Sequence, residues 1–125
     1  MRYGTVVRRN FKIRMNITGG LVEDHHVIPS EWRTHPVIKT LNYDVNSSCN
    51  IVIMPTYYGM EKLNVRRDRL VHHGGHIEYN KFVKQILDNM MHIDDHKDLL
   101  NEFKDKHGYL KKNCRDNVDG IPWRS

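Results

Sequence analysis

Two adjacent histidines stand at the centre of the stretch that decides the fold, Glu23-Asp24-His25-His26-Val27-Ile28-Pro29. The Gly19-Gly20 pair before it indicates a turn, and proline cannot donate to a sheet ladder, so we expect a short strand from Leu21 to about Val27. Adjacent side chains on a strand point to opposite faces. The twist at a strand end nevertheless lets two neighbours reach one site. Taken alone, the pair is better interpreted as two surface histidines.

A second histidine cluster lies further along the chain, Val71-His72-His73-Gly74-Gly75-His76. In a helix, the four-residue spacing of His72 and His76 places two imidazoles on one face, which is a metal-binding arrangement. Two glycines inside a helix would cost about 2 kcal/mol relative to alanine. We therefore expect a tight turn into a helix there, with close backbone approach to a metal or a phosphate. Together with His25, the two histidines supply three nitrogen ligands and leave metal positions open, as catalytic sites do.

Outside these clusters, the sequence pattern indicates an α+β chain. Apolar residues alternate with polar and basic ones from Asn10 to Ile17, which predicts a half-buried strand. The pattern then predicts a long loop at residues 30–49 that contains one helical turn. It also predicts a second strand at 50–54 and two helices, at 76–91 and 94–112. We expect an extended tail from residue 116, and one domain with three parts, at residues 1–22, 23–91 and 92–125.

The composition excludes several classes of protein. With 125 residues, 38% hydrophobic and 28% charged, the chain can bury one core. No apolar run approaches the roughly 20 residues of a membrane span. Two cysteines, Cys49 and Cys114, form neither a disulfide scaffold nor a four-thiolate zinc site. We therefore expect an intracellular protein, in the cytoplasm or nucleus of a host cell, with a toxic domain cut from a larger secreted protein as the alternative.

The excess positive charge lies entirely at one end. Residues 1–22 hold five basic residues and no acidic one, whereas the other residues hold 15 of each sign. A local basic stripe is typical of proteins that bind a phosphate backbone, although a solvated strand face would look the same. The candidate nucleic-acid-binding residues are Arg8, Lys12 and Arg14 in this segment and Arg66, Arg67 and Arg69 before the second histidine cluster.

The histidines belong to a longer ordered series, His25-His26-Val27-Ile28-Pro29, His35-Pro36, Asn50, Pro55, His72-x-Gly74-x-His76 and Tyr79. This series resembles the AHH branch of the HNH, or ββα-metal, nuclease superfamily over about residues 24–88. The family pattern runs Ala-His-His-x-x-Pro, a loop, Asn-Gly-x-x-Leu-Pro, then His-x-Gly-x-His-x-x-Tyr. This chain departs from it at Asp24, Ile51 and Met54, which replace alanine, glycine and leucine.

The resemblance implies a ββα-metal (His-Me finger) core, to which an N-terminal strand or hairpin and C-terminal helices are added. It also implies the roles of the residues. Because Pro29 follows His26 by three positions, His26 is the general base and His25 a metal ligand. The alternative register makes Asp24 the ligand and His25 the base. By the same resemblance, Asn50 bonds across the hairpin loop and fixes the His26 ring.

The implied activity is that of a metal-dependent endonuclease that hydrolyses DNA phosphodiester bonds and leaves 5′-phosphate and 3′-hydroxyl ends. One divalent ion, held by His25, His72 and His76, would be magnesium, manganese, zinc, nickel or cobalt. RNA stays open as a substrate, and no membrane is expected as a partner. A homodimer is consistent with the need to cut two strands, and an immunity protein would accompany a toxin domain.

The alternative function is a nucleic-acid-binding module that cleaves nothing and whose histidines hold a structural zinc. Such a site normally has four protein ligands. If His26 were the fourth ligand, it could not also act as the general base. Of the other residues, we expect His35 to pack against or cap the loop, and His73 to face solvent or phosphate. We expect Tyr79 to lie in the core or reach the site. Surface positions are expected for the remaining histidines, His92, His96 and His107.

Overall fold

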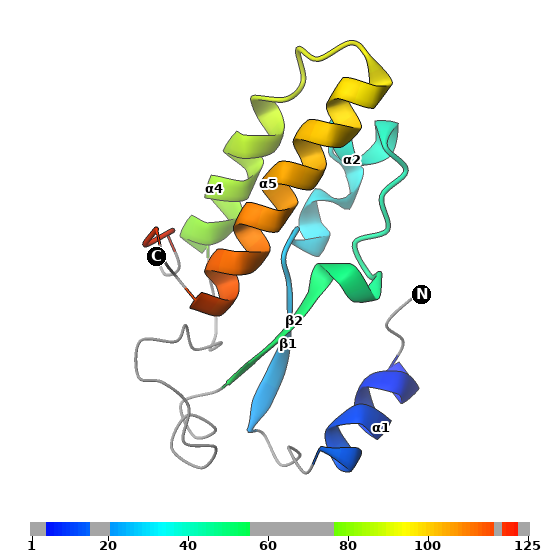
Figure 1. The fold of residues 1–125 in the computed structure, drawn as a ribbon, viewed down its shortest axis with the longest axis vertical. Coiled ribbons are helices and arrows are strands. Elements are labelled where there is room, and N and C mark those ends of the chain that lie inside the picture. Colours follow the sequence, from blue (N-terminus) through cyan, green and yellow to red (C-terminus); the bar gives the residue numbers. More distant parts are fainter. Residues whose placement is uncertain (1–4, 16–20, 56–76, 117–118, 123–125) are drawn as a thin grey trace.

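The computed structural model describes residues 5–15, 21–55, 77–116 and 119–122. In residues 5–15 it describes the side chains only from residue 9 onwards. The chain is a small α+β protein, as the sequence pattern predicts (Figure 1). The elements, in chain order, are α1 (Thr5–Arg14), β1 (Val22–His26), η1 (Ser30–Thr34), α2 (Pro36–Thr40), η2 (Ser48–Asn50), β2 (Ile51–Pro55), α4 (Ile77–Asp88) and α5 (His96–Asp116).

The two strands form one antiparallel pair. His25 lies opposite Val52, and His26 lies opposite Ile51 at the end of the ladder. Both strands and the long loop between them, with its short helix α2, confirm the predicted order of elements. Because the ladder ends at His26, the loop leaves the sheet directly beside the histidine pair.

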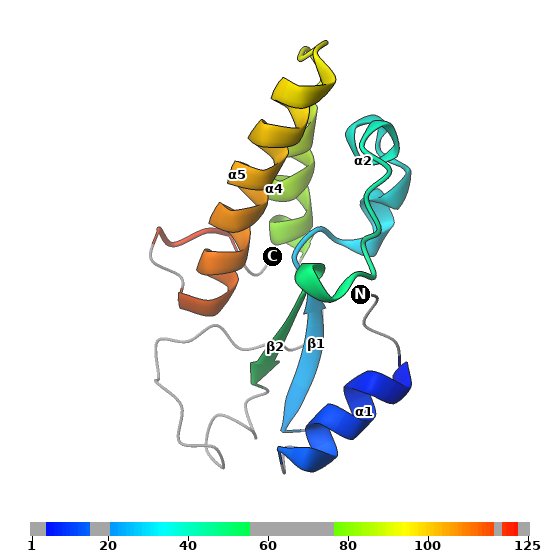
Figure 2. The ribbon, with the colours of Figure 1, turned by 45° about the vertical axis from the view of Figure 1, so that its right-hand side comes forward.

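Helices α4 and α5 lie side by side above the strand pair, as Figures 1 and 2 both show. The predicted helix at 76–91 is confirmed as α4, whose buried residues Tyr79, Val83 and Leu87 recur every four positions. Burying one face at this spacing is what makes an amphipathic helix stable in a small domain. The predicted helix at 94–112 is confirmed as α5, but it starts at His96 and continues to Asp116. Its first turn is capped by Asp95, whose carboxylate accepts a hydrogen bond of 3.0 Å from the backbone N–H of Asp98.

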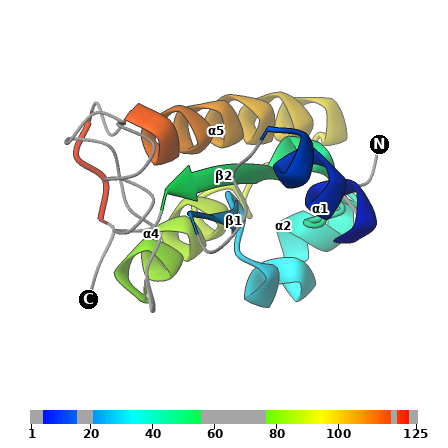
Figure 3. The same cartoon turned by 90° about the horizontal axis from the view of Figure 1, so that it is seen from below.

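The hydrophobic core fills the space between the helices and the start of the loop. Val27 and Ile28, the first loop residues, are buried with Met54 of β2 and with Val83 and Leu110 of the two helices. Figure 3 looks up at the strand pair from below, with α5 at the top of the view and α4 at the lower left. The core therefore anchors the chain immediately after the histidine pair, which fixes the position of β1's end.

The strand predicted at residues 10–17 is wrong, because this region contains the helix α1. The apolar residues of the alternating pattern are not a buried face: Ile13 is 59% exposed and Met15 is 56% exposed. Within the described residues the sheet has only the two strands β1 and β2, so residues 10–14 have no ladder partner there. A helix satisfies its backbone hydrogen bonds within the segment, which explains why the local pattern does not decide the structure. No helix among the described residues has the length and apolar character needed to cross a membrane.

Candidate functional site

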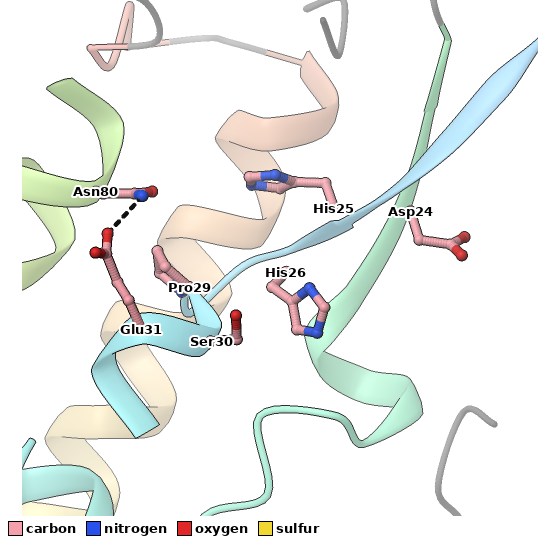
Figure 4. A pocket seen from close by; sticks show the side chains of 7 residues that line it. All are labelled: Asp24, His25, His26, Pro29, Ser30, Glu31 and Asn80. Carbon is pink, nitrogen blue, oxygen red and sulfur yellow. Dashed lines mark hydrogen bonds between the residues drawn. The ribbon is translucent and has the colours of Figure 1, made fainter. Parts of the chain in front are cut away.

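His25 and His26 share one cavity at the end of β1 (Figure 4). The cavity has a volume of about 200 Å³ and is also lined by Asp24, Pro29, Ser30, Glu31 and Asn80. The two rings leave the strand in different directions, and only 1% of His25 is exposed whereas His26 is half-buried. The strand end thus brings both predicted histidines to one concave site, although their neighbours differ.

Tyr79, in the first turn of α4, packs edge-on against His25 with 5.1 Å between the ring centres. Its hydroxyl donates a 2.6 Å hydrogen bond to the backbone carbonyl of Val27 and accepts one from the Cys114 thiol. Burial raises the pKa of the Tyr79 phenol well above its ordinary value, so the phenol stays protonated. Tyr79 is therefore a core tyrosine that ties α4 to the end of β1.

Asn50, fully buried before β2, bonds across the loop between the strands. Its side-chain oxygen accepts a 2.9 Å hydrogen bond from the Ile28 backbone N–H, and its amide nitrogen donates to the carbonyls of Ile28 and Val45 at 3.0 and 2.7 Å. The amide thus joins the beginning and the end of the loop. The resemblance also implies that Asn50 fixes the His26 ring directly, and the structure, which describes both residues, has no hydrogen bond between them.

The side chain that contacts the His26 ring is Asn46. His26 Nε2 and Asn46 Oδ1 lie 3.0 Å apart. Within the described residues, the Nδ1 atom of the same ring makes no hydrogen bond. Nothing in the local sequence identifies Asn46, because it is 20 residues from His26 and forms part of an irregular loop.

The sequence predicts a surface position for His107, but this residue is half-buried. It lies on α5, where Nε2 is 3.0 Å from Asn50 Oδ1 and 3.1 Å from the Tyr43 hydroxyl. Burial, with a smaller contribution from the positive charge of Lys111, lowers the pKa of His107 from 6.5 to about 4. His107 is therefore neutral at physiological pH. Because Asn50 Oδ1 is an acceptor, Nε2 carries the proton and donates to it.

His35 caps the loop, as predicted. Its Nδ1 accepts a 3.1 Å hydrogen bond from the Val37 N–H at the start of α2, so Nε2 carries the proton and donates at 2.7 Å to Asp88. Hydrogen bonds from Lys84 and then His35 lower the pKa of the Asp88 carboxyl below its ordinary value. His35 therefore joins the loop to the end of α4 and lies outside the cavity.

The basic α1 residues, Arg8, Lys12 and Arg14, lie on the helix that replaces the predicted strand. Lys12 Nζ is 3.5 Å from Asp24 Oδ2, so α1 approaches β1 beside the cavity. The Arg14 guanidinium lies over the Phe11 ring, 5.9 Å from its centre. The Arg8 side chain lies outside the described part of the chain.

The remaining predicted site residues also lie outside the described residues: His72, His76, Arg66, Arg67 and Arg69. Within the described ranges, no three histidine, cysteine, aspartate or glutamate side chains form a group that could hold a metal ion. Of the predicted ligands, the described part of the chain therefore positions His25.

Comparison with known proteins links the chain to one family. No curated protein and no solved structure matches the chain. A family model described as a nuclease family of the HNH/ENDO VII superfamily with conserved AHH matches residues 8–114, which include most of α1, the strand pair, α4 and most of α5. Since this match covers most of the 125 residues, the chain belongs to the AHH nuclease family.

Proposed function

We propose that this nuclease is a metal-dependent endonuclease that hydrolyses DNA phosphodiester bonds with His26 as its general base. The observation that carries the proposal is the placement of His25 and His26, side by side in sequence, on one cavity at the end of β1. The two rings have different environments, since His25 is buried against Tyr79 and His26 is half-buried beside Asn46. This difference supports different roles, with His25 as a ligand and His26 as a base.

The donor set fits a divalent metal ion. His25 offers an imidazole at the cavity, and His72 and His76 would complete the three nitrogen ligands. Tyr79, three residues after His76 in the sequence, packs against His25, which supports assigning the three histidines to one site. Imidazole ligands suit zinc, nickel, cobalt and manganese, and magnesium stays a candidate through the family resemblance. A bound ion would supply positive charge to the phosphate and to the departing 3′ oxygen.

His26 would perform the proton transfer. An imidazole has an ordinary pKa of about 6.5, so a neutral ring can take a proton from water near neutral pH. With Nε2 directed at Asn46, the Nδ1 atom would accept that proton. The water oxygen then bonds to phosphorus as the bond to the 3′ oxygen breaks, and the departing 3′ oxygen takes a proton from solvent. The products are a 5′-phosphate and a 3′-hydroxyl.

Substrate binding would use the basic surface beside the cavity. Lys12 reaches Asp24, a cavity residue, so α1 lies where a phosphate backbone could contact both α1 and the site. We propose the basic α1 residues as the first phosphate contacts and Arg66, Arg67 and Arg69 as a second set. A homodimer would allow two strands to be cut, and an immunity protein would be required if the chain acts as a toxin domain. Action inside a cell, where nucleic acid is present, follows from this proposal.

The experiment that tests the proposal is plasmid cleavage. Purified protein is incubated with supercoiled DNA and magnesium, manganese, zinc, nickel or cobalt, with and without a chelator. We expect metal-dependent nicking by the parent protein and none by His26→Ala. Tight zinc binding without cleavage under any metal would instead favour the structural-zinc module. That alternative would need His26 as a fourth ligand, although its Nε2 contacts Asn46.

A further inference from the structure

We infer that Asn46 is a positioning residue that fixes the tautomer and orientation of the His26 ring. The inference rests on the proposed role of His26 as the base. Asn46 Oδ1 lies 3.0 Å from His26 Nε2, and an amide oxygen can only accept a hydrogen bond. The contact therefore requires the proton on Nε2, which leaves the lone pair on Nδ1.

The loop holds the backbone of Asn46 at its own N–H and at the residue before it. The backbone N–H of Asn46 donates a 2.9 Å hydrogen bond to the Asp44 carboxylate, which closes a tight turn. The preceding residue, Val45, is 3% exposed, and its carbonyl accepts a 2.7 Å hydrogen bond from the buried Asn50 amide. The backbone of Asn46 is thus fixed before its side chain reaches His26, so the contact has to order only the side chain.

This arrangement divides one task between two asparagines. Asn50 is buried and holds the loop, whereas Asn46 is exposed and holds the ring. His107 adds a bond from α5 to the same Asn50 oxygen that accepts from Ile28. The ring of His26 is therefore connected through the loop to the helical part of the core, although His26 itself is only half-buried.

A fixed tautomer matters because only an unprotonated nitrogen can accept a proton. A ring that exchanges between tautomers presents the wrong nitrogen to water for part of the time, and a ring that rotates loses alignment. Removing Asn46 should therefore reduce turnover without removing the base. The expected size is about five- to tenfold in kcat, the effect of one hydrogen bond.

The direct test is nitrogen NMR of the histidine rings in the metal-free protein, at a pH of about 9, where imidazole is neutral. We expect the His26 ring of the parent to be the Nε2–H tautomer alone. In Asn46→Ala it should shift towards the mixture of tautomers that an unrestrained imidazole shows. Asn46→Asp keeps an acceptor oxygen and should restore the parent spectrum. An Nδ1–H tautomer in the parent, or an unchanged spectrum in Asn46→Ala, would overturn the inference.

Kinetics with the metal-loaded enzyme provide the second readout. Asn46→Ala should lower kcat and leave KM unchanged, and Asn46→Asp should recover kcat. Asn101→Ala, which removes an exposed asparagine from α5, is the matched control and should change neither. A fall in thermal stability with an unchanged tautomer would show a merely structural role and would overturn the inference. If the parent protein cleaves nothing, the proposed function fails, while the NMR result still decides whether Asn46 fixes the ring.

Discussion

Replacing Asn50 with alanine should destabilise the fold strongly, because this one side chain closes the loop between the strands. The Asn50 amide takes part in four hydrogen bonds, with the N–H and carbonyl of Ile28, the carbonyl of Val45 and the ring of His107. The side chain is 0% exposed, so water cannot replace it without opening the core. The variant would leave buried polar groups unsatisfied at both ends of the loop.

The expected size follows from the number of bonds. At about 1 kcal/mol for each hydrogen bond, the loss is about 4 kcal/mol in the free energy of unfolding. That is a large share of the roughly 5–15 kcal/mol that stabilises a typical domain. Asn50→Asp should be at least as damaging at neutral pH. It keeps the two acceptor contacts but directs a carboxylate oxygen at the carbonyls of Ile28 and Val45.

Urea unfolding followed by circular dichroism measures this loss, with Asn113→Ala as the matched control. Asn113 is also buried, at 2% exposure, but its amide makes two hydrogen bonds, to the Tyr109 carbonyl and from the Asp119 N–H. The control should therefore lose about 2 kcal/mol. If Asn50→Ala loses no more than Asn113→Ala, then Asn50 does not clamp the loop as the structure indicates.

Four further predictions concern the site and its surroundings. His26→Ala should reduce cleavage by about 10²–10⁴-fold, while metal binding measured by calorimetry stays intact. His72→Ala should weaken metal binding at least about tenfold, because losing a ligand should cost no less than losing an outer-shell partner, which typically costs about 10–100-fold. His73→Ala should leave metal binding unchanged, and equal losses in the two variants would refute the assignment of His72 from its four-residue spacing to His76. Replacing the basic α1 residues together should lower the slope of log affinity against log salt by about 0.9 for each phosphate that the variant no longer neutralises. An unchanged slope would transfer that role to the second basic set. The pKa of His107 is lowered to about 4 in the folded protein. As the pH falls, His107 therefore takes up its proton at a higher pH in the unfolded chain than in the folded one. The stability contributed by neutral His107, at most about 3 kcal/mol, should therefore be lost as the pH falls from about 6.5 to 4, and His107→Gln should flatten that decline in urea titrations.

Sequence reasoning succeeded where a single local rule controlled the structure. Pro29 and Pro55 mark the ends of the two predicted strands, and the four-residue spacing of buried side chains in α4 gives the helix directly. It fails for α1, because the short alternation there does not correspond to a buried face. Ile13 and Met15 are more than half exposed, so the alternation carried no information about the core. A period of two is decisive only when a partner strand and a buried face exist to enforce it.

The contacts around His26 and Asn50 were beyond sequence reasoning for a different reason. The His26–Asn46 pair spans 20 residues and the Asn50–His107 pair spans 57, and neither spacing follows a helix or strand period. Both contacts depend on where the long loop is held, which is decided by the packing of Val27 and its neighbours against the helices.

Helix α5 therefore belongs to the same structural unit as the histidine site, although its sequence lies outside the histidine motif. His107 donates to the Asn50 side chain, and Lys111, one helical turn later, donates a 2.9 Å hydrogen bond to the Cys49 carbonyl. Two neighbouring loop residues are thus held from one face of α5, directly before β2 begins. The family match supports the same interpretation, because it continues through α5 to residue 114 and does not stop at α4. A motif limited to residues 24–88 contains the proposed chemistry, but the support that holds Asn50 in place lies beyond it.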